Sequence, residues 1–166
     1  DRVSPDPEVT RVVHDSRTVE PGDLFCCITG THHDGHDHME QAVEAGAVAV
    51  LAEHPVALHA PVVVVESVRQ TMPFLAAAVV GDPSHDLRVV GVTGTNGKTS
   101  VAHMLAGVLD SLGRRSEAIG TLSGIRTTPE APEFQRCLAA WLHEGVECVV
   151  AEVSSHALAQ HRVDGT

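Results

Sequence analysis

The sequence has few aromatic residues and few basic ones. Aromatic side chains make up only 2% of the 166 residues, although 43% are hydrophobic, so we expect a globular core built from Val, Leu and Ala. Lys and Arg number 11 against 22 Asp and Glu, which gives a formal net charge of −11. Without a block of basic residues, this balance argues against a nucleic-acid or membrane-surface partner. A small phosphorylated ligand, which needs only local positive charge, stays possible.

Cysteine motifs and long apolar runs are also missing. No apolar stretch reaches the ~18 residues of a membrane span, and no signal-peptide pattern opens the sequence. The cysteines show neither C-x-x-C spacing nor a secretory framework, so we expect free, buried thiols in a reducing cytoplasm. We also expect a monomer. The four are Cys26, Cys27, Cys137 and Cys148.

The most informative stretch is Val89–Ser100, which reads V-V-G-V-T-G-T-N-G-K-T-S. A β-branched run, a glycine-rich turn, a lysine and a helical pattern follow one another in the order of a phosphate-binding loop. Val92 stands where the common G-x-x-x-x-G-K-[ST] pattern has its first glycine. An ordinary strand-to-helix turn with a solvated lysine would leave the glycines unexplained, so we expect a nucleotide site.

Apolar patterns predict an α/β fold in two parts. Residues 1–84 read as a small α/β domain, with strands at 9–13, 24–28, 47–51 and 61–65 and helices near 38–45 and 67–80. Residues 85–166 alternate strands (87–92, 116–120, 146–152) with helices (99–112, 132–144), which indicates a parallel sheet covered by helices. The chain begins with Asp1 and ends at Thr166 just after a strand-like turn. We therefore expect the beginning of a longer protein whose second domain is incomplete.

The loop and one later strand carry the residue types of phosphoryl-transfer chemistry. Lys98 is expected to contact the β- and γ-phosphates of a nucleotide, and the Thr99 hydroxyl to reach a bridging Mg²⁺. Ligands of parallel sheets bind at the carboxyl ends of strands. Glu152 follows an apolar run at such an end, so it is the expected acidic partner of the metal, unless it is a solvated loop acid.

Other polar residues carry weaker signals. The histidines at 32, 33, 36 and 38 fit no tetrahedral zinc pattern, so a polar loop that touches a ligand is the better interpretation. Arg17, Arg126 and Arg162 stand on predicted loops of an acidic protein, where an arginine either binds an anionic substrate or is an ordinary surface residue.

Several motifs together resemble the Mur ligase family. They are G-T-N-G-K-T-S at 94–100, A-E-V-S-S-H-A-L-A-Q-H-R-V at 151–163, H-D-S-R-T-V-E-P-G-D-L-F at 14–25, and G-A-V-A-V-L-A-E at 46–53. Their order covers nearly the whole chain. The upstream motifs are most similar to the members that add the third residue, diaminopimelate or lysine, to UDP-MurNAc-L-Ala-D-Glu in peptidoglycan synthesis.

The resemblance implies roles for individual residues. ATP would be bound by Gly94, Thr95, Asn96, Gly97, Lys98, Thr99 and Ser100, and Mg²⁺ by Thr99 and Glu152. The UDP-sugar end of the substrate would meet Ser16, Thr31, His32 and His33. The muramoyl-peptide part would be held by Thr127, Thr128, Ser154, Gln160 and Arg162. Lys98 and Glu152 would be the catalytic residues.

The implied reaction is an amide ligation driven by ATP. The γ-phosphate passes to the substrate carboxylate, and the amino group of the incoming diamino acid attacks the resulting acyl phosphate. Family members use a further domain and a second metal site, so we expect the 166 residues alone to be inactive. The alternatives are another P-loop enzyme, such as a kinase or GTPase, and a non-catalytic nucleotide-binding domain.

Overall fold

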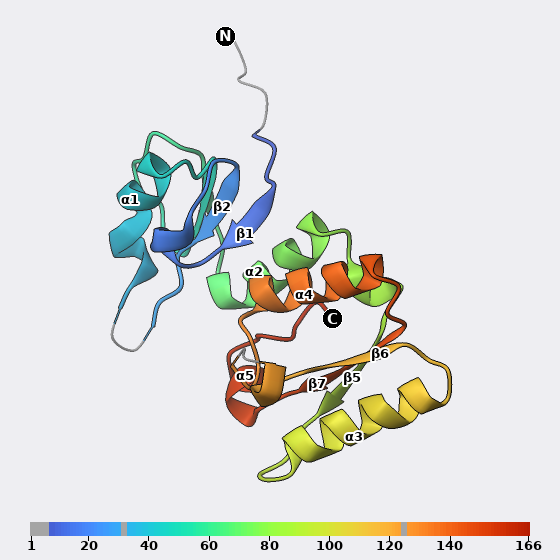
Figure 1. Cartoon of the computed structure of the whole chain (residues 1–166). Helices are drawn as coiled ribbons and strands as arrows, with labels where there is room; N and C mark the ends of the chain where they lie inside the picture. The colour runs from blue at the N-terminus through green and yellow to red at the C-terminus, as the bar shows by residue number, and fades with distance from the viewer. Residues whose placement is uncertain (1–6, 31–32, 124–125) are drawn as a thin grey trace. The chain divides into compact units, whose positions relative to one another are not determined.

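The computed structural model describes residues 7–30, 33–123 and 126–166 (Figure 1). The chain divides into two compact units between Leu75 and Ala76. This division lies inside helix α2 (Val68–Val79), which contains Pro73. The sequence placed the boundary later, at residues 84–85, because a turn cluster follows the helix. Buried Ala76 and Ala77 already belong to the second unit.

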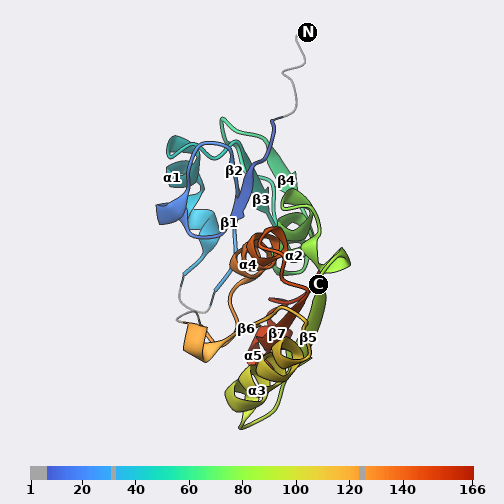
Figure 2. The same cartoon turned by 45° about the vertical axis from the view of Figure 1, so that its right-hand side comes forward.

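The first unit contains a sheet of four parallel strands in the order β1-β2-β3-β4 (Figure 2). The strands are β1 (Arg11–Val13), β2 (Asp23–Cys26), β3 (Ala49–Ala52) and β4 (Val62–Val64). Helix α1 (Met39–Glu44) buries Met39 and Ala42 in an apolar cluster with Phe25 and Val50. One face of the sheet thus gains its cover from a helix of only six residues.

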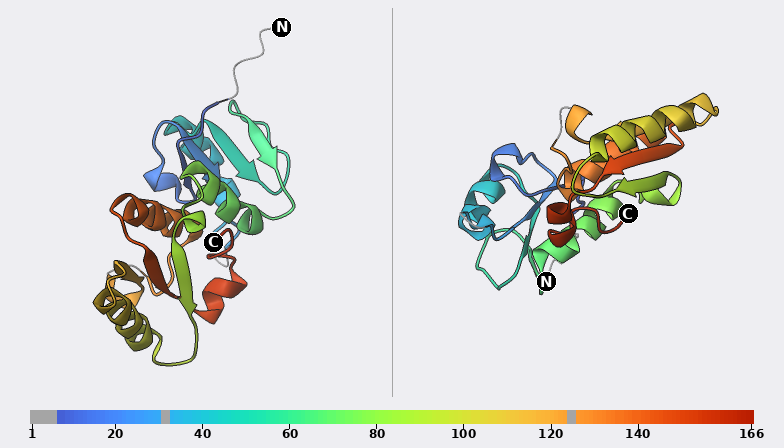
Figure 3. Two further views of the ribbon diagram at one scale, coloured as in Figure 1. Left: turned by 90° about the vertical axis from the view of Figure 1, so that its right-hand side faces the viewer. Right: turned by 90° about the horizontal axis from the view of Figure 1, so that it is seen from below.

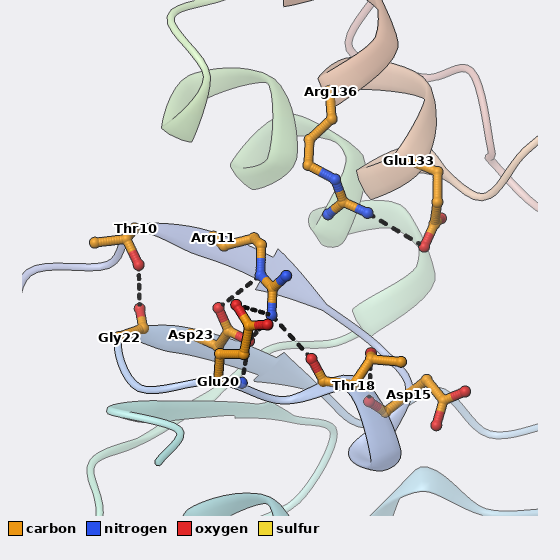
Figure 4. A network of polar contacts seen from close by, with 9 residues as sticks. All are labelled: Thr10, Arg11, Asp15, Thr18, Glu20, Gly22, Asp23, Glu133 and Arg136. Carbon is orange, nitrogen blue, oxygen red and sulfur yellow. Dashed lines mark hydrogen bonds and ion pairs between the residues drawn. The ribbon is translucent and has the colours of Figure 1, made fainter. Parts of the chain in front are cut away.

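An ion pair fixes the register of the first two strands. Arg11 lies opposite Asp23, and its guanidinium is 2.7 Å from the carboxylate, which is almost fully buried (Figure 4). The backbone N–H of Glu20 donates to the same carboxylate at 2.8 Å, and Arg11 also donates to the Thr18 carbonyl. The hydrogen bond with Asp23 raises the pKa of Arg11 above its ordinary value. The buried Asp23 carboxylate is tolerated because the Arg11 guanidinium and the Glu20 N–H both donate to it.

The second unit contains a parallel sheet, as the alternating sequence pattern predicted (Figure 1). The strand order is β5-β7-β6. Its strands are β5 (Arg88–Val92), β6 (Ser116–Ile119) and β7 (Cys148–Glu152). Its helices are α3 (Lys98–Ser111), α4 (Ala131–His143) and α5 (Ser155–Ala159). The α/β class with parallel sheets is therefore confirmed.

The two faces of the central strand β7 pack against different helices. Val149 and Ala151 share an apolar cluster with Phe134 and Leu138 of α4. Val150 packs instead with Ala102 and Ala106 of α3, which lies along the strands in Figure 3. Side chains alternate between the faces of a strand, so Glu152 shares the side of Val150 and points toward α3. The position of Glu152 thus follows from the alternation along a fully buried strand.

Short elements complete the structure. Among the described residues, 3-10 helices lie in four connections: Ser16–Thr18, Gly35–His38, Pro83–His85 and Thr121–Ser123. The sequence predicted none of these elements and did not predict α5. Cys26, Cys27 and Cys148 are free and buried as expected, whereas Cys137 is half-buried. Burial raises the pKa of Cys27 to about 12. Across the described ranges, no helix has the length and apolar character that crossing a membrane requires.

Candidate functional site

The loop between β5 and α3 turns at two glycines with left-handed backbone angles. Gly94 and Gly97 have positive φ values of 149° and 79°, a conformation that side chains with a Cβ rarely adopt. Gly97 caps the N-terminus of α3, and the helix begins at Lys98. Thr95 and Asn96 are exposed between the two glycines. Free N–H groups at the start of a fourteen-residue helix and a lysine at its first position suit an anion.

The Lys98 ammonium group folds back over this turn. Its Nζ donates to the Gly94 carbonyl at 2.8 Å. This contact brings the ammonium group back over the loop that precedes α3. One exposed hydrogen bond to a carbonyl is weak compared with a contact to a phosphate. The side chain is therefore free to exchange this carbonyl for an anionic ligand.

Glu152, the last residue of β7, is a buried carboxylate at the carboxyl end of the central strand, with 2% of its surface exposed. Its Oε2 accepts a hydrogen bond of 2.8 Å from the Thr99 hydroxyl, and its Oε1 accepts one of 2.8 Å from the Thr121 backbone N–H. The Thr121 hydroxyl lies 3.4 Å from Oε2. The acid is thus held directly beside the start of α3.

Gly120 makes room for this carboxylate. A Cβ at position 120 would lie 2.0 Å from Glu152 Oε1 and 2.4 Å from its carboxyl carbon. A Cβ essentially never lies this close to a non-bonded heavy atom, so a side chain at 120 would require Glu152 to move. Gly120 follows β6 directly, and the carboxyl end of β6 therefore shapes the pocket around the acid at the end of β7.

The T-T-P motif lies beside the same strand end. The buried Thr128 hydroxyl donates to the Glu152 carbonyl at 2.9 Å and accepts from the Ser154 N–H at 3.1 Å. Ser154 caps α5 through a bond from the Ala157 N–H to its Oγ. Thr127 lies nearer the surface, with its hydroxyl 3.1 Å from that of Thr121. Thr128 therefore contacts Glu152 directly, whereas Thr127 reaches it only through Thr121, and the Thr127 side chain is the more exposed of the two.

Arg162 connects the T-T-P-E segment to the residues after α5. Its guanidinium donates to the Thr128 carbonyl at 3.1 Å and to Gln160 Oε1 at 2.6 Å, and lies 2.9 Å from Glu130. The side chains of Arg162 and Glu130 are 11% and 10% exposed. Arg126, exposed, lies 4.0 Å from the same Glu130 carboxylate. Arg162 therefore holds this corner together, and its positive charge is paired with Glu130.

The remaining predicted residues belong to the first unit. The Ser16 hydroxyl donates to Gln41 Oε1 at 3.1 Å, and His33 is exposed. Thr31 and His32 lie outside the described residues. The Asp34 carboxylate forms a hydrogen bond of 2.6 Å with His36 Nδ1. A short ion pair of 2.6 Å joins Arg17 and Asp15. The hydrogen bonds from Arg17 lower the pKa of Asp15 to about 2.

Three residues of the site escaped the sequence analysis: Gly120, Thr121 and Glu130. Gly120 and Thr121 follow β6 directly, and the rule that ligands bind at the carboxyl ends of parallel strands could have pointed to them. Glu130 follows the T-T-P motif and carried no signal of its own. Its partner Arg162 is far along the chain, and only the fold brings the two together.

The residues around Glu152 fit a divalent cation. No cationic side chain of the described residues pairs with this buried carboxylate, which accepts hydrogen bonds only from hydroxyl and N–H groups. An unpaired buried charge is costly. Oxygen donors from one carboxylate and one hydroxyl, completed by phosphates and water, are typical of Mg²⁺. In the described ranges no three His, Cys, Asp or Glu side chains form a metal cluster, so such an ion would depend on a phosphate ligand.

A parallel sheet, a glycine-containing turn ahead of a helix, and an acid at the neighbouring strand end define a P-loop type α/β protein. Models of protein families identify which kind of P-loop protein this is. Residues 8–86 match the "Mur ligase family, catalytic domain" and residues 92–166 match the "Mur ligase middle domain". The chain belongs to the Mur ligase family.

Known proteins agree with this assignment. The chain is 46% identical to the UDP-N-acetylmuramoyl-L-alanyl-D-glutamate–2,6-diaminopimelate ligase of Geobacillus thermodenitrificans, over 96% of the chain and 34% of that protein. The enzyme of the same name from Streptomyces avermitilis is 43% identical with the same two coverages. The chain thus spans about a third of the length of these curated relatives.

Solved structures show the same fold. A structure of a UDP-N-acetylmuramoyl-L-alanyl-D-glutamate–2,6-diaminopimelate ligase superimposes with a TM-score of 0.83 and 29% identity, covering 95% of the chain and 34% of the other. MurF ligase from Thermotoga maritima, solved in complex with ADP, gives a TM-score of 0.65 and 28% identity, covering 92% and 34%. The similarity extends across both units of the chain.

Proposed function

We propose that this chain forms part of an ATP-dependent ligase that adds diaminopimelate to UDP-MurNAc-L-Ala-D-Glu. The single observation that carries the proposal is the 46% identity over 96% of the chain to a ligase named for this reaction. The geometry supports it, because the glycine loop, Lys98 and Glu152 occupy one end of the second sheet. Lysine as the added residue, which the sequence left open, is not favoured by these names.

In this proposal the loop residues Gly94 to Ser100 bind ATP. The ammonium group of Lys98 would leave the Gly94 carbonyl for the β- and γ-phosphates, where it offsets the charge that develops during transfer. The substrate carboxylate would attack the γ-phosphorus and release ADP. The amine of diaminopimelate would then attack the acyl phosphate, so that an amide forms, phosphate leaves and the nitrogen loses a proton.

The proposed substrate contacts fall into two sets, one in each part of the chain. The proposed contacts to the muramoyl-peptide part are Thr127, Thr128, Ser154, Gln160 and Arg162. Ser16, Thr31, His32 and His33 are the proposed contacts to the UDP-sugar end. Aligning the carboxylate with the phosphate is worth several kcal/mol of the barrier in reactions of this type.

Thr99 and Glu152 would hold Mg²⁺. A bound Mg²⁺ supplies charge neutralisation on the β- and γ-phosphates. Thr99 would turn its hydroxyl proton away from Glu152 to offer an oxygen lone pair, and Glu152 would keep its bond to the Thr121 N–H. The cytoplasmic location and the monomeric state expected from the sequence stay predictions.

Calorimetry on the protein made from its complete coding sequence tests the proposal. We expect calorimetry to show binding of ATP with Mg²⁺ and of UDP-MurNAc-L-Ala-D-Glu. In a separate phosphate-release assay, we expect turnover to require the UDP-dipeptide, ATP and diaminopimelate together. Binding of GTP without the UDP-dipeptide would favour a different P-loop enzyme. Nucleotide binding without any phosphate release would favour a non-catalytic domain. The 166 residues alone are expected to show no turnover.

A further inference from the structure

Three threonine hydroxyls from separate segments form a chain that passes the Glu152 carboxylate. Thr99 comes from the start of α3, Thr121 from the 3-10 helix after β6, and Thr127 from the T-T-P motif. Thr99 Oγ1 lies 2.8 Å from Glu152 Oε2, Thr121 Oγ1 lies 3.4 Å from the same oxygen, and Thr127 Oγ1 lies 3.1 Å from Thr121 Oγ1. The acid and the surface hydroxyl of Thr127 are therefore joined through a single hydroxyl.

Thr121 contacts the acid in two distinct ways. Its backbone N–H donates to Oε1 at 2.8 Å, which holds the carboxylate in one orientation and leaves Oε2 facing Thr99. Its hydroxyl approaches Oε2 at the longer distance of 3.4 Å. Removal of the hydroxyl alone would keep the N–H contact, so the two contributions are separable by mutation.

A hydroxyl has one proton to donate, so the Thr121 hydroxyl has two alternative states. When it donates to Glu152 Oε2, Thr127 must donate to Thr121 and presents only an acceptor to its surroundings. When it donates to Thr127, the proton of Thr127 is free to point outward. A cation beside Oε2 repels the proton and attracts the oxygen of Thr121. Cation occupancy therefore favours the second state.

We propose that Thr121 is a positioning residue that couples a divalent cation at Glu152 to the hydrogen-bonding direction of Thr127, so that Mg²⁺–nucleotide prepares Thr127 to donate to an acceptor of the UDP-linked substrate. The proposal rests on the proposed function. Thr127 and Glu152 each belong to that function, but no direct contact links them. Thr121 supplies the link without touching either ligand.

Calorimetry measures this coupling. The Kd of UDP-MurNAc-L-Ala-D-Glu is determined with Mg²⁺ and the non-hydrolysable analogue AMP-PNP, and again with AMP-PNP and EDTA. The coupling factor is the Kd measured with EDTA divided by the Kd measured with Mg²⁺. Because one hydrogen bond is worth about 0.5–1.5 kcal/mol, we expect the wild-type ratio to exceed that of Thr121→Val by about twofold to tenfold.

Three further variants make the result specific. Thr121→Ser keeps the hydroxyl and should restore the wild-type coupling factor. Thr121→Ala removes the hydroxyl with less bulk and replaces Thr121→Val if that variant does not fold. Ser111→Ala removes a hydroxyl at the other end of α3, where Ser111 donates to the Val108 carbonyl, and should leave the factor unchanged. If Thr121 had only a structural role, its loss would raise both Kd values by the same factor and leave their ratio unchanged.

The possible outcomes separate the two proposals. Loss of coupling in Thr121→Val or Thr121→Ala, with recovery in Thr121→Ser, supports the role of Thr121. Unchanged coupling in the hydroxyl-free variants, or no coupling in the wild type, overturns it and leaves the ligase function standing. Absence of UDP-dipeptide binding to the wild type under either condition overturns the proposed function itself.

Discussion

The Thr99 hydroxyl donates a 2.8 Å hydrogen bond to Glu152, although 53 residues separate the two in the chain. The contact joins the first turn of α3 to the carboxyl end of the central strand. It requires Gly120, because a Cβ there would occupy the volume of the carboxylate.

Replacement Glu152→Gln should weaken Mg²⁺ dependence while preserving the fold. The amide keeps the shape of the side chain and an oxygen acceptor for the Thr121 N–H, but removes the negative charge that a hard cation requires. We expect the Mg²⁺ concentration for half-maximal activity to rise at least about tenfold. A magnesium titration of phosphate release measures it. An unchanged titration curve would rule out Glu152 as a metal ligand.

Replacement Lys98→Ala should abolish ATP use and leave the thermal stability almost unchanged. In the structure Lys98 makes one hydrogen bond, to the Gly94 carbonyl, so its removal should shift the free energy of unfolding by less than about 1 kcal/mol. Nucleotide calorimetry and a thermal melt measure the two effects. Arg114→Ala is the control, because it removes a positive charge from an exposed pair with Glu147. Normal turnover in Lys98→Ala would refute the loop assignment.

Replacement Gly120→Ala should both destabilise the protein and displace Glu152. The new Cβ would lie 2.0 Å from the carboxylate oxygen, and overpacking of this kind costs about 1–3 kcal/mol. Gly107→Ala is the matched control, because a Cβ at that helical position meets nothing within 4 Å and should stabilise by about 0.5–1 kcal/mol. Denaturant unfolding compares the two variants. Equal stability of both would contradict the packing around Glu152.

Replacement Arg17→Ala should raise the pKa of Asp15 from about 2 toward its ordinary value of 3.8. The hydrogen bond from Arg17 is the main cause of the lowered value. Because the folded pKa is the lower one, the stabilisation is present above pH 3.8 and is lost as the pH falls through about 2. Carbon-detected NMR of the carboxyl group follows the titration. Arg114→Ala should leave the Asp15 curve in place.

The sequence predicted the framework of the second unit well, because its signals are local. Apolar runs of the right length mark β5 and β7, and the glycines and Lys98 mark the turn between β5 and α3. Glu152 could be expected at a strand end from its position after Val149, Val150 and Ala151. These inferences need only neighbouring residues and the geometry of parallel sheets.

Long-range contacts could not be predicted in the same way. The approach of Gly120 to Glu152 and of Glu130 to Arg162 depends on which strands are neighbours and on their register. Helix α5 has five residues, which is too short for a helical period to appear in the sequence. Such features arise from packing between segments that are distant in the chain. The division into compact units falls inside α2, whereas the predicted boundary at 84–85 is near the gap between the two family matches, residues 8–86 and 92–166.

Lys98 is the only lysine in the 166 residues. Its ammonium group donates to one carbonyl at an exposed loop. The side-chain primary amine of these residues therefore lies in the proposed nucleotide site. An amine-directed acylating reagent would therefore modify one side chain of this region. The fraction of peptide with the mass shift would measure how much of the loop is free of nucleotide. Protection by ATP would appear as the loss of a single peptide adduct, without a mutation and without a labelled nucleotide.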